Sequence, residues 1–299
     1  MTYFLFAATV LIWGTSWIAI ALQIGDVPVV VSVFYRFATA GVIFILALVL
    51  LKKLVIPRRG HWPWILLQAV CLFSLNFICF YLSAAYITSG LIAVIFSLSV
   101  LFNAINARIF FRERITPKTI FACVVGLTGL ICLFGPDIFK SENADNLLGI
   151  GFASLGTLFF SFGNMVSRHL NTKEVSPITA NAWGMCLGAI ILMIIIQVAQ
   201  YPIVIPAAPT YWLAMFYLAI VGSVLGFSAY LLLLSRVGSA QAAYVTILFP
   251  IVALTISTFV EGYQWTFNAV LGIGLAITGN IIMFTKTSKP PLPATEPAK

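Results

Sequence analysis

Apolar stretches of about 20 residues recur from one end of the chain to the other, and this pattern constrains its fold most strongly. As a helix, each stretch would cross a hydrocarbon layer of about 30 Å. Only 8% of the 299 residues are charged, whereas a soluble domain carries about 25%. The stretches are continuous and lack the alternation of a membrane β-barrel strand. We therefore expect an all-α polytopic membrane protein.

The apolar stretches predict ten transmembrane helices. Proline tends to occupy the first turn of a helix, and Pro28, Pro117 and Pro177 mark three of the starts. The first stretch has no basic segment before it and no cleavage signature after it, so we interpret it as a retained span. The polar, proline-rich residues 286–299 predict a disordered cytoplasmic tail. The predicted spans are 3–22, 28–51, 63–85, 89–110, 117–135, 147–167, 177–199, 210–235, 240–260 and 265–285.

The basic residues predict the orientation of the chain. If the N-terminus is cytoplasmic, fourteen of the sixteen Lys and Arg residues fall on the cytoplasmic side. Lys140 alone lies outside and Arg36 alone lies within the membrane. Cytoplasmic loops carry an excess of Lys and Arg. We expect a multi-pass protein of the cell inner (plasma) membrane with both termini in the cytoplasm.

The chain also repeats itself. A shift of 150 residues lays Ser89 on Ser239 and Thr116 on Thr266, and brings the two "TG" pairs near residues 128 and 278 into register. Chance similarity between leucine-rich helices is the alternative, but loop lengths and the parity of the spans favour a duplication.

The duplication predicts two repeats of opposite orientation. Residues 1–136 form the first five-helix repeat and residues 137–285 the second. Because five is odd, similar halves must enter the membrane from opposite sides, which gives an inverted-topology repeat. Secondary transporters use this architecture and place the substrate near the midplane between the halves.

Arg36, in the stretch "SVFYRFATAG", is the costliest residue of the predicted spans. It lies about 12 Å along its helix from the outer end, where an unpaired charge costs about 2.5–3.5 kcal/mol. No Asp or Glu occurs deep in any predicted span. A substrate carboxylate would suit a guanidinium well, and the corresponding place in the second half, around residues 183–185, carries no charge. Substrate or gating contact and a structural, hydrogen-bonded role both stay open.

Other polar and aromatic residues lie far from the predicted interfaces. Each Asn or Ser is either a ligand contact or a bond between helices, and Trp and Tyr, Trp17 included, either line a cavity or anchor an interface. Pro250 within an apolar span indicates a hinge or a fixed bend. Small residues such as Gly129 and Gly272 favour close helix packing or dimerisation. The candidate binding residues, with Arg36, are Trp13, Ser16, Asn76, Tyr81, Asn103, Asn164, Trp183, Tyr230 and Tyr244.

Several segments resemble the EamA-type family of the drug/metabolite transporter superfamily. They are "LIWGTSWIAI", "YRFATAG", "AAYITSGLIAVIFSL" and "LFPIVALTISTFVEGYQWT". The resemblance implies a ten-helix inverted repeat in the inner membrane, with a central cavity formed largely by the first four helices of each half. It implies export of amino acids, their analogues, aromatic compounds, sugars or nucleotide-linked metabolites. The place that matches Pro250 in the first half holds Ser99 or Val100, so the two halves need not bend alike.

These observations predict a secondary transporter that exports or exchanges a small metabolite by alternating access. An amino acid or analogue with an apolar or aromatic side chain is favoured; another organic anion, a drug-like compound or a nucleotide-linked metabolite is the alternative. A non-transporting membrane sensor or scaffold is the other class. We find no nucleophile–base pair, HExxH or P-loop, and expect no enzyme, cofactor, metal or nucleic acid. Proton coupling and exchange stay open, as do monomer and homodimer.

Overall fold

The structure is a computed structural model, and it describes residues 2–139, 144–230, 233 and 245–284. Every regular element in these ranges is helical, so the prediction of an all-α chain is confirmed. Seven stretches of helix in the described part are long and apolar enough to cross a membrane, and three further apolar segments are shorter. The elements are α1 (Thr2–Ala21), α2 (Val29–Leu50), η1 (Arg59–His61), α3 (Trp62–Val70), η2 (Cys71–Leu75), α4 (Asn76–Ala84), α5 (Ser89–Ser97), α6 (Ser99–Phe111), α7 (Pro117–Phe139), α8 (Ala144–Thr172), α9 (Pro177–Val198), α10 (Pro209–Phe216), η3 (Tyr217–Leu225), α12 (Val245–Val260) and α13 (Phe267–Phe284).

Most helix bounds agree with the predicted spans to within a few residues. α8 is the main exception, because it runs over Ala144–Thr172 where the hydropathy predicts residues 147–167. The extra turns contain Arg168 and His169, which belong outside an apolar span but not outside a helix. Parts of the eighth and ninth predicted spans, and the tail at 286–299, lie outside the described residues.

Two of the spans contain a π-helical segment. Within the span Arg59–Ala84 it is η2, and within the span Pro209–Tyr230 it is η3. In each segment a serine hydroxyl donates to the carbonyl five residues earlier: Ser74 to Ala69 at 3.1 Å and Ser223 to Leu218 at 2.9 Å. A π-bulge re-aims the side chains that follow it and is frequent at functional sites.

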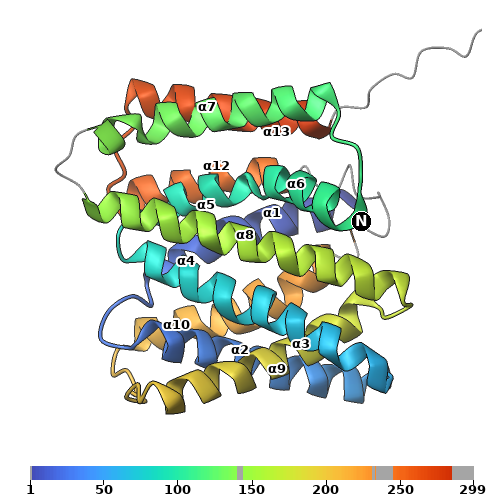
Figure 1. Cartoon of the computed structure of the whole chain (residues 1–299). Coiled ribbons are helices and arrows are strands. Elements are labelled where there is room, and N and C mark those ends of the chain that lie inside the picture. Colours follow the sequence, from blue (N-terminus) through green and yellow to red (C-terminus); the bar gives the residue numbers. More distant parts are fainter. Residues whose placement is uncertain (1, 140–143, 231–232, 234–244, 285–299) are drawn as a thin grey trace, which may run out of the picture.

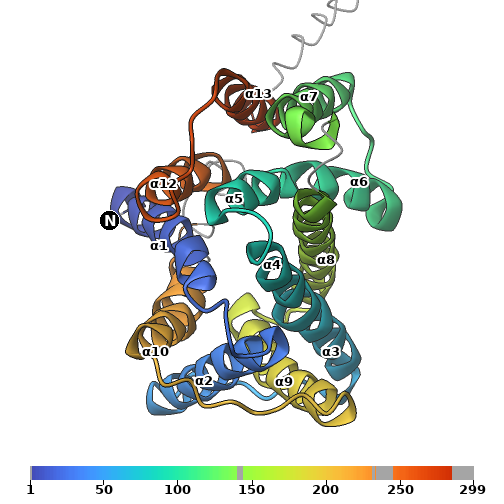
Figure 2. The same ribbon diagram turned by 90° about the vertical axis from the view of Figure 1, so that its left-hand side faces the viewer.

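The helices are arranged as a ring with one pair set apart. Figure 2 shows α1, α12, α5, α4, α8, α3, α9, α2 and α10 around a common centre, while α7 and α13 lie together at one edge. α2 packs along α9 and α7 along α13, each pair joining distant parts of the chain. α8 packs against both α4 and α6, and α1 packs against both α12 and η3.

Glycines let α7 and α13 approach closely. A Cβ atom added at Gly129 would lie 2.6 Å from the backbone nitrogen of Ala276 and 2.6 Å from the carbonyl oxygen of Gly272. One added at Gly279 would lie 2.8 Å from the backbone of Ala122. The predicted packing role of these small residues is confirmed, and the contact lies within one chain.

The two ends of the bundle differ in charge. The N-terminus lies at the same end as the α2–α3 and α6–α7 connections (Figure 1), which carry most of the described lysines and arginines. At the other end, the Glu261 carboxylate accepts hydrogen bonds from the Ser89 backbone N–H and hydroxyl. This contact joins the end of α12 to the start of α5. Nearby, the Ser83 hydroxyl donates to the Gly149 carbonyl at 2.7 Å.

Candidate functional site

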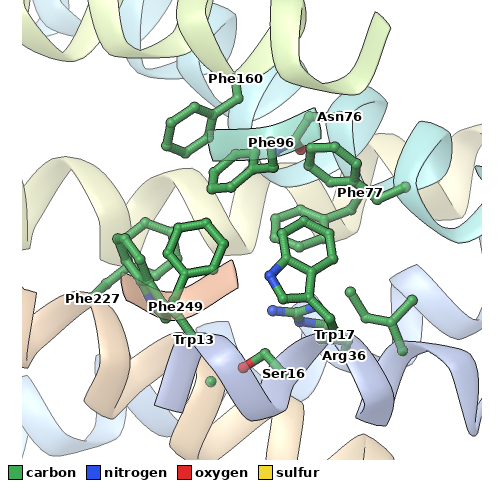
Figure 3. Close-up of a pocket in the computed structure, with 13 residues that line it drawn as sticks. Trp13, Ser16, Trp17, Arg36, Asn76, Phe77, Phe96, Phe160, Phe227 and Phe249 are labelled. Atoms are coloured by element: carbon green, nitrogen blue, oxygen red, sulfur yellow. The ribbon is translucent and has the colours of Figure 1, made fainter. Parts of the chain in front are cut away.

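A cavity of about 60 Å³ lies inside the ring of helices. Its wall is built from α1, α2, α4, α5, α8, η3 and α12, so both sequence halves contribute. Figure 3 shows the side chains converging on this space. Arg36, Ser16 and Asn76 are its polar lining. The aromatic lining residues are Trp13, Trp17, Phe77, Phe80, Phe96, Phe160, Phe227 and Phe249.

Arg36 enters the cavity from α2 and is only 3% exposed. Its Nε donates to the Ser223 hydroxyl at 3.2 Å, while Nη1 has no hydrogen-bond partner. The guanidinium carbon lies 4.2 Å from the centre of the Phe77 ring and 5.3 Å from that of Phe37, which are cation–π distances. Among the described residues the ion pair that occurs joins Arg168 to Glu113, and no described carboxylate pairs with Arg36.

Asn76 is the second unsatisfied polar group of the cavity. It follows the π-helical segment η2 and is 1% exposed. Neither its Oδ1 nor its Nδ2 has a hydrogen-bond partner. A buried polar group without a partner costs about 1–3 kcal/mol, so the amide has a donor and an acceptor available inside the cavity.

Residues of α1 form another side of the cavity. The Ser16 hydroxyl lines the space and donates to the Ile12 carbonyl at 2.6 Å. The Trp13 ring packs on Phe227 at 5.8 Å and on Tyr230 at 4.9 Å between centroids. Tyr230 thus contacts the lining residue Trp13 and is not itself among the lining residues.

Tyr81 is buried beside the cavity and does not line it. Its hydroxyl donates to Gln23 Oε1 at 2.6 Å and also interacts electrostatically with the Arg36 guanidinium. Gln23, which is 2% exposed, was not among the sequence candidates. It follows directly after the first span, where a glutamine is ordinary, so no sequence signal separates it from a loop residue.

Asn103 and Asn164 are not brought to the cavity. The Ser161 hydroxyl donates to Asn103 Oδ1 at 2.8 Å, and Asn164 Nδ2 lies 3.4 Å from the same oxygen. Asn106 Nδ2 donates to the Ser161 hydroxyl at 2.8 Å. These residues form a hydrogen-bonded contact between α6 and α8, and their role in substrate binding stays a prediction.

Three further candidates also lie elsewhere. Trp183 Nε1 donates to the Val55 carbonyl at 3.0 Å, and its ring packs on Trp62. Tyr244 lies outside the described residues. Pro250 is buried in α12, which is helical on both sides of it, so its role as a hinge stays a prediction.

Most of the aromatic wall could not be selected from sequence. The chain has 25 phenylalanines, and nothing in the hydropathy separates those that face the cavity from those that face lipid. Phe77 has the clearest signal, because it directly follows Asn76. Ser223, which holds Arg36, is one small polar residue among many in the predicted spans.

The lining residues offer a positive charge, hydrogen-bonding groups and aromatic surface to a ligand. A cation and an amide face the same space, and the rest of the wall is almost wholly aromatic. No group of three or more His, Cys, Asp or Glu side chains that could hold a metal ion occurs among the described residues.

Comparison with known proteins finds similarity over nearly the whole chain. The model of the EamA-like transporter family matches residues 1–135 and again residues 147–285. An uncharacterized transporter of Buchnera aphidicola subsp. Schizaphis graminum is 26% identical over 96% of this chain and 98% of its own. The uncharacterized inner membrane transporter YedA of Escherichia coli K12 is 23% identical over 92% of this chain and 88% of its own. A protein crystal structure with 16% sequence identity shares the fold, with a TM-score of 0.66 over 94% of this chain and 95% of its own.

Proposed function

The chain belongs to the EamA-like transporter family, and from this premise we propose that it exports or exchanges a small carboxylate-bearing metabolite with an apolar or aromatic body. An amino acid or amino-acid analogue fits this description best. Arg36 binds the carboxylate, Asn76 supplies a polar contact, and the rings of Trp13, Trp17 and the cavity phenylalanines enclose the apolar part.

The observation that carries this proposal is the unpartnered Nη1 of Arg36. A buried guanidinium with a free N–H group and no carboxylate among the described residues lacks the partner that it binds best. Ser223 and Phe77 hold the group in place, so little rotamer freedom is lost when an anion arrives. The unpartnered amide of Asn76 offers both a hydrogen-bond donor and an acceptor to the same ligand.

The size of the cavity supports the proposed alternating access. Its volume of about 60 Å³ is well below the roughly 300–1,000 Å³ of ordinary ligand pockets. A metabolite therefore fits only after the helices separate. The small volume and the unpartnered polar groups support a resting state in which the site does not yet hold a metabolite.

We further propose that the two halves, residues 1–136 and 137–285, are an inverted repeat. Support comes from the two family matches and from the pairing of α2 with α9 and α7 with α13, each the same element of its half. The third span of each half contains a π-helical segment with a serine bonded five residues back. A relative described as an inner membrane transporter supports the same membrane here, with both termini in the cytoplasm by the distribution of lysine and arginine.

Counterflow in proteoliposomes tests the substrate and the role of Arg36. Vesicles loaded with one unlabelled metabolite are assayed for uptake of the labelled compound, across a panel of amino acids, their amides and other organic anions. We expect Arg36→Gln to reduce uptake of the best carboxylate substrate at least about tenfold, since a hydrogen bond to a charged group contributes about 1.5–3 kcal/mol. Arg36→Lys keeps the charge but loses the planar, two-pronged donor of the guanidinium. Its uptake should lie between that of the wild type and that of Arg36→Gln.

The amide of the same substrate is the matched control. If Arg36 binds the carboxylate, the amide, which lacks that negative charge, should lose no transport when Arg36 is replaced by Gln. Equal transport of the carboxylate by both proteins would show that Arg36 has another role. Tight binding without movement of any compound would favour the sensor class instead.

A further inference from the structure

A second cavity, of about 380 Å³, lies between α3, α6 and α8 near the basic end of the bundle. It is separate from the central cavity and shares none of its lining residues. Trp64 and Leu67 of α3 form one wall, Phe110 and Phe111 of α6 the other, and Phe162 of α8 lies among them. Both α3 and α6 pack on α8, so the cavity is a groove with α8 as its floor.

The groove opens on the side of the bundle that faces lipid. Trp64 is 40%, Leu67 43% and Phe110 56% exposed. In a multi-pass protein, apolar side chains this exposed near a helix end contact hydrocarbon and the headgroup boundary. Tryptophan is enriched at that boundary. The groove therefore offers an apolar channel of the kind that an acyl chain fills.

One end of the groove is basic. His169, which packs on Trp64 with 4.2 Å between ring centres, lies at that end. The Arg168 guanidinium lies 4.3 Å from the Phe111 ring and pairs with Glu113. Exposed Arg108 and Arg112 lie on the last turn of α6 and just after it. Glu113 lies on the same rim, where Arg108, Arg112 and Arg168 outnumber it.

We propose that the groove is a binding site for an anionic phospholipid. The acyl chain lies against Trp64, Leu67 and Phe110, and the headgroup phosphate lies near Arg108 and Arg112. Basic pockets between transmembrane helices are suited to anionic headgroups, and arginine binds phosphate with two parallel hydrogen bonds. The inference does not depend on which metabolite is transported.

Brominated lipids test the proposal, because bromine quenches tryptophan fluorescence only at contact. The full chain is reconstituted in phosphatidylcholine vesicles that contain an equal mole fraction of either dibrominated phosphatidylglycerol or dibrominated phosphatidylcholine. The Trp64 signal is the difference between the wild type and Trp64→Phe. We expect the anionic lipid to bind in the groove about fivefold more tightly than phosphatidylcholine. This is the gain from about one added contact between an arginine and the headgroup.

The chain offers a matched pair of charge variants. Arg108→Gln with Arg112→Gln should abolish the preference, whereas Lys52→Gln with Lys53→Gln should leave it unchanged. Each pair removes two charges from the basic end, and each contains one residue with a left-handed backbone, Arg112 at φ 57° and Lys52 at φ 54°. Thermal melting of all variants checks that they are folded.

Three outcomes would overturn the proposal. Equal quenching by the two lipids would mean that the groove does not select charge. An equal loss of preference in both double variants would assign it to the surface charge of the whole end. A Trp64 signal that neither lipid quenches would mean that the groove is closed to lipid, for instance by a second copy of the chain.

Discussion

We predict that the contact between Glu261 and the start of α5 stabilises the closed form of one end of the bundle. Ser89 is the first residue of α5, where backbone N–H groups lack helical partners. The two carboxylate oxygens of Glu261 accept the Ser89 N–H at 3.0 and 3.1 Å, and one also accepts its hydroxyl. The carboxylate also lies at the positive end of the helix dipole. Because α5 and α12 fall in different family matches, we expect that opening this end would break the contact.

The free energy at stake follows from the kind of bond. A hydrogen bond to a charged group contributes about 1.5–3 kcal/mol and a neutral one about 0.5–1.5 kcal/mol. Glu261→Gln keeps an oxygen acceptor and loses the charge, so the closed state should lose about 1 kcal/mol, which is about a fivefold rise in the open-to-closed ratio. Ser89→Ala removes only the hydroxyl and should have a smaller effect.

Spin-label distances measure this ratio directly. With the five native cysteines replaced, labels at Ala85→Cys and Gln264→Cys report the separation of α4 from the segment after α12 at this end. Both positions are exposed. We expect Glu261→Gln to increase the population at long distance about fivefold.

A helix cap elsewhere provides the control. The Ser176 hydroxyl accepts from the Thr179 N–H at 3.2 Å at the start of α9, and Ser176→Ala should lower thermal stability by about 1 kcal/mol without moving the labels. If Glu261→Gln behaved in the same way, losing stability with an unchanged distance distribution, the contact would be a cap and the reasoning about closure would be refuted.

Three further predictions concern packing and the cavity. Gly129→Ala should lower the melting temperature strongly, because the added methyl group meets backbone atoms at 2.6 Å. Gly274→Ala is the control and should leave the melting temperature unchanged, because nothing lies within 4 Å of its added methyl group. Equal melting temperatures for the two variants would contradict the close contact. Ser161→Ala should cost about 1 kcal/mol in thermal or denaturant unfolding, since each of its two bonds between helices is worth about 0.6 kcal/mol. Ser223→Ala should raise KM for a carboxylate substrate about tenfold with little change in kcat, as it removes the bond that holds Arg36; a change in kcat alone would argue against positioning.

The helices were predictable because hydrocarbon imposes a simple length and polarity rule on them. The rule marks where a chain leaves the lipid, not where a helix ends, and α8 shows the difference. It continues through Arg168 and His169 to Thr172, because helical hydrogen bonds are equally available in the headgroup region. A hydropathy boundary stops before these polar residues.

The candidate site was only partly predictable, because burial cost identifies unusual residues but not their partners. Arg36 was selected by its cost, and it lines the cavity. Asn76 and Asn103 have the same chemistry and similar depth in neighbouring spans. One has two unpartnered atoms in the cavity and the other accepts a hydrogen bond from Ser161 on α8. The difference depends on the direction in which each helix faces, and in wholly apolar spans the hydropathy pattern carries little of that information.

The π-helical segments locate where the two halves differ. Ser74 and Ser223 lie 149 residues apart, each bonded to the carbonyl five residues before it. Ser223 also accepts from the Arg36 guanidinium of α2, while Ser74 lies 3.5 Å from the Gly188 carbonyl of α9. The same shift lays Arg36 on Met185, which is fully buried. The two corresponding serines thus differ in what they contact. Ser223 holds a charged side chain toward the cavity, whereas Ser74 contacts only backbone carbonyls. The repeated scaffold therefore does not require an arginine at this position. A purely structural role for Arg36 would not explain why α2 buries a costly guanidinium where α9 buries the apolar side chain of Met185.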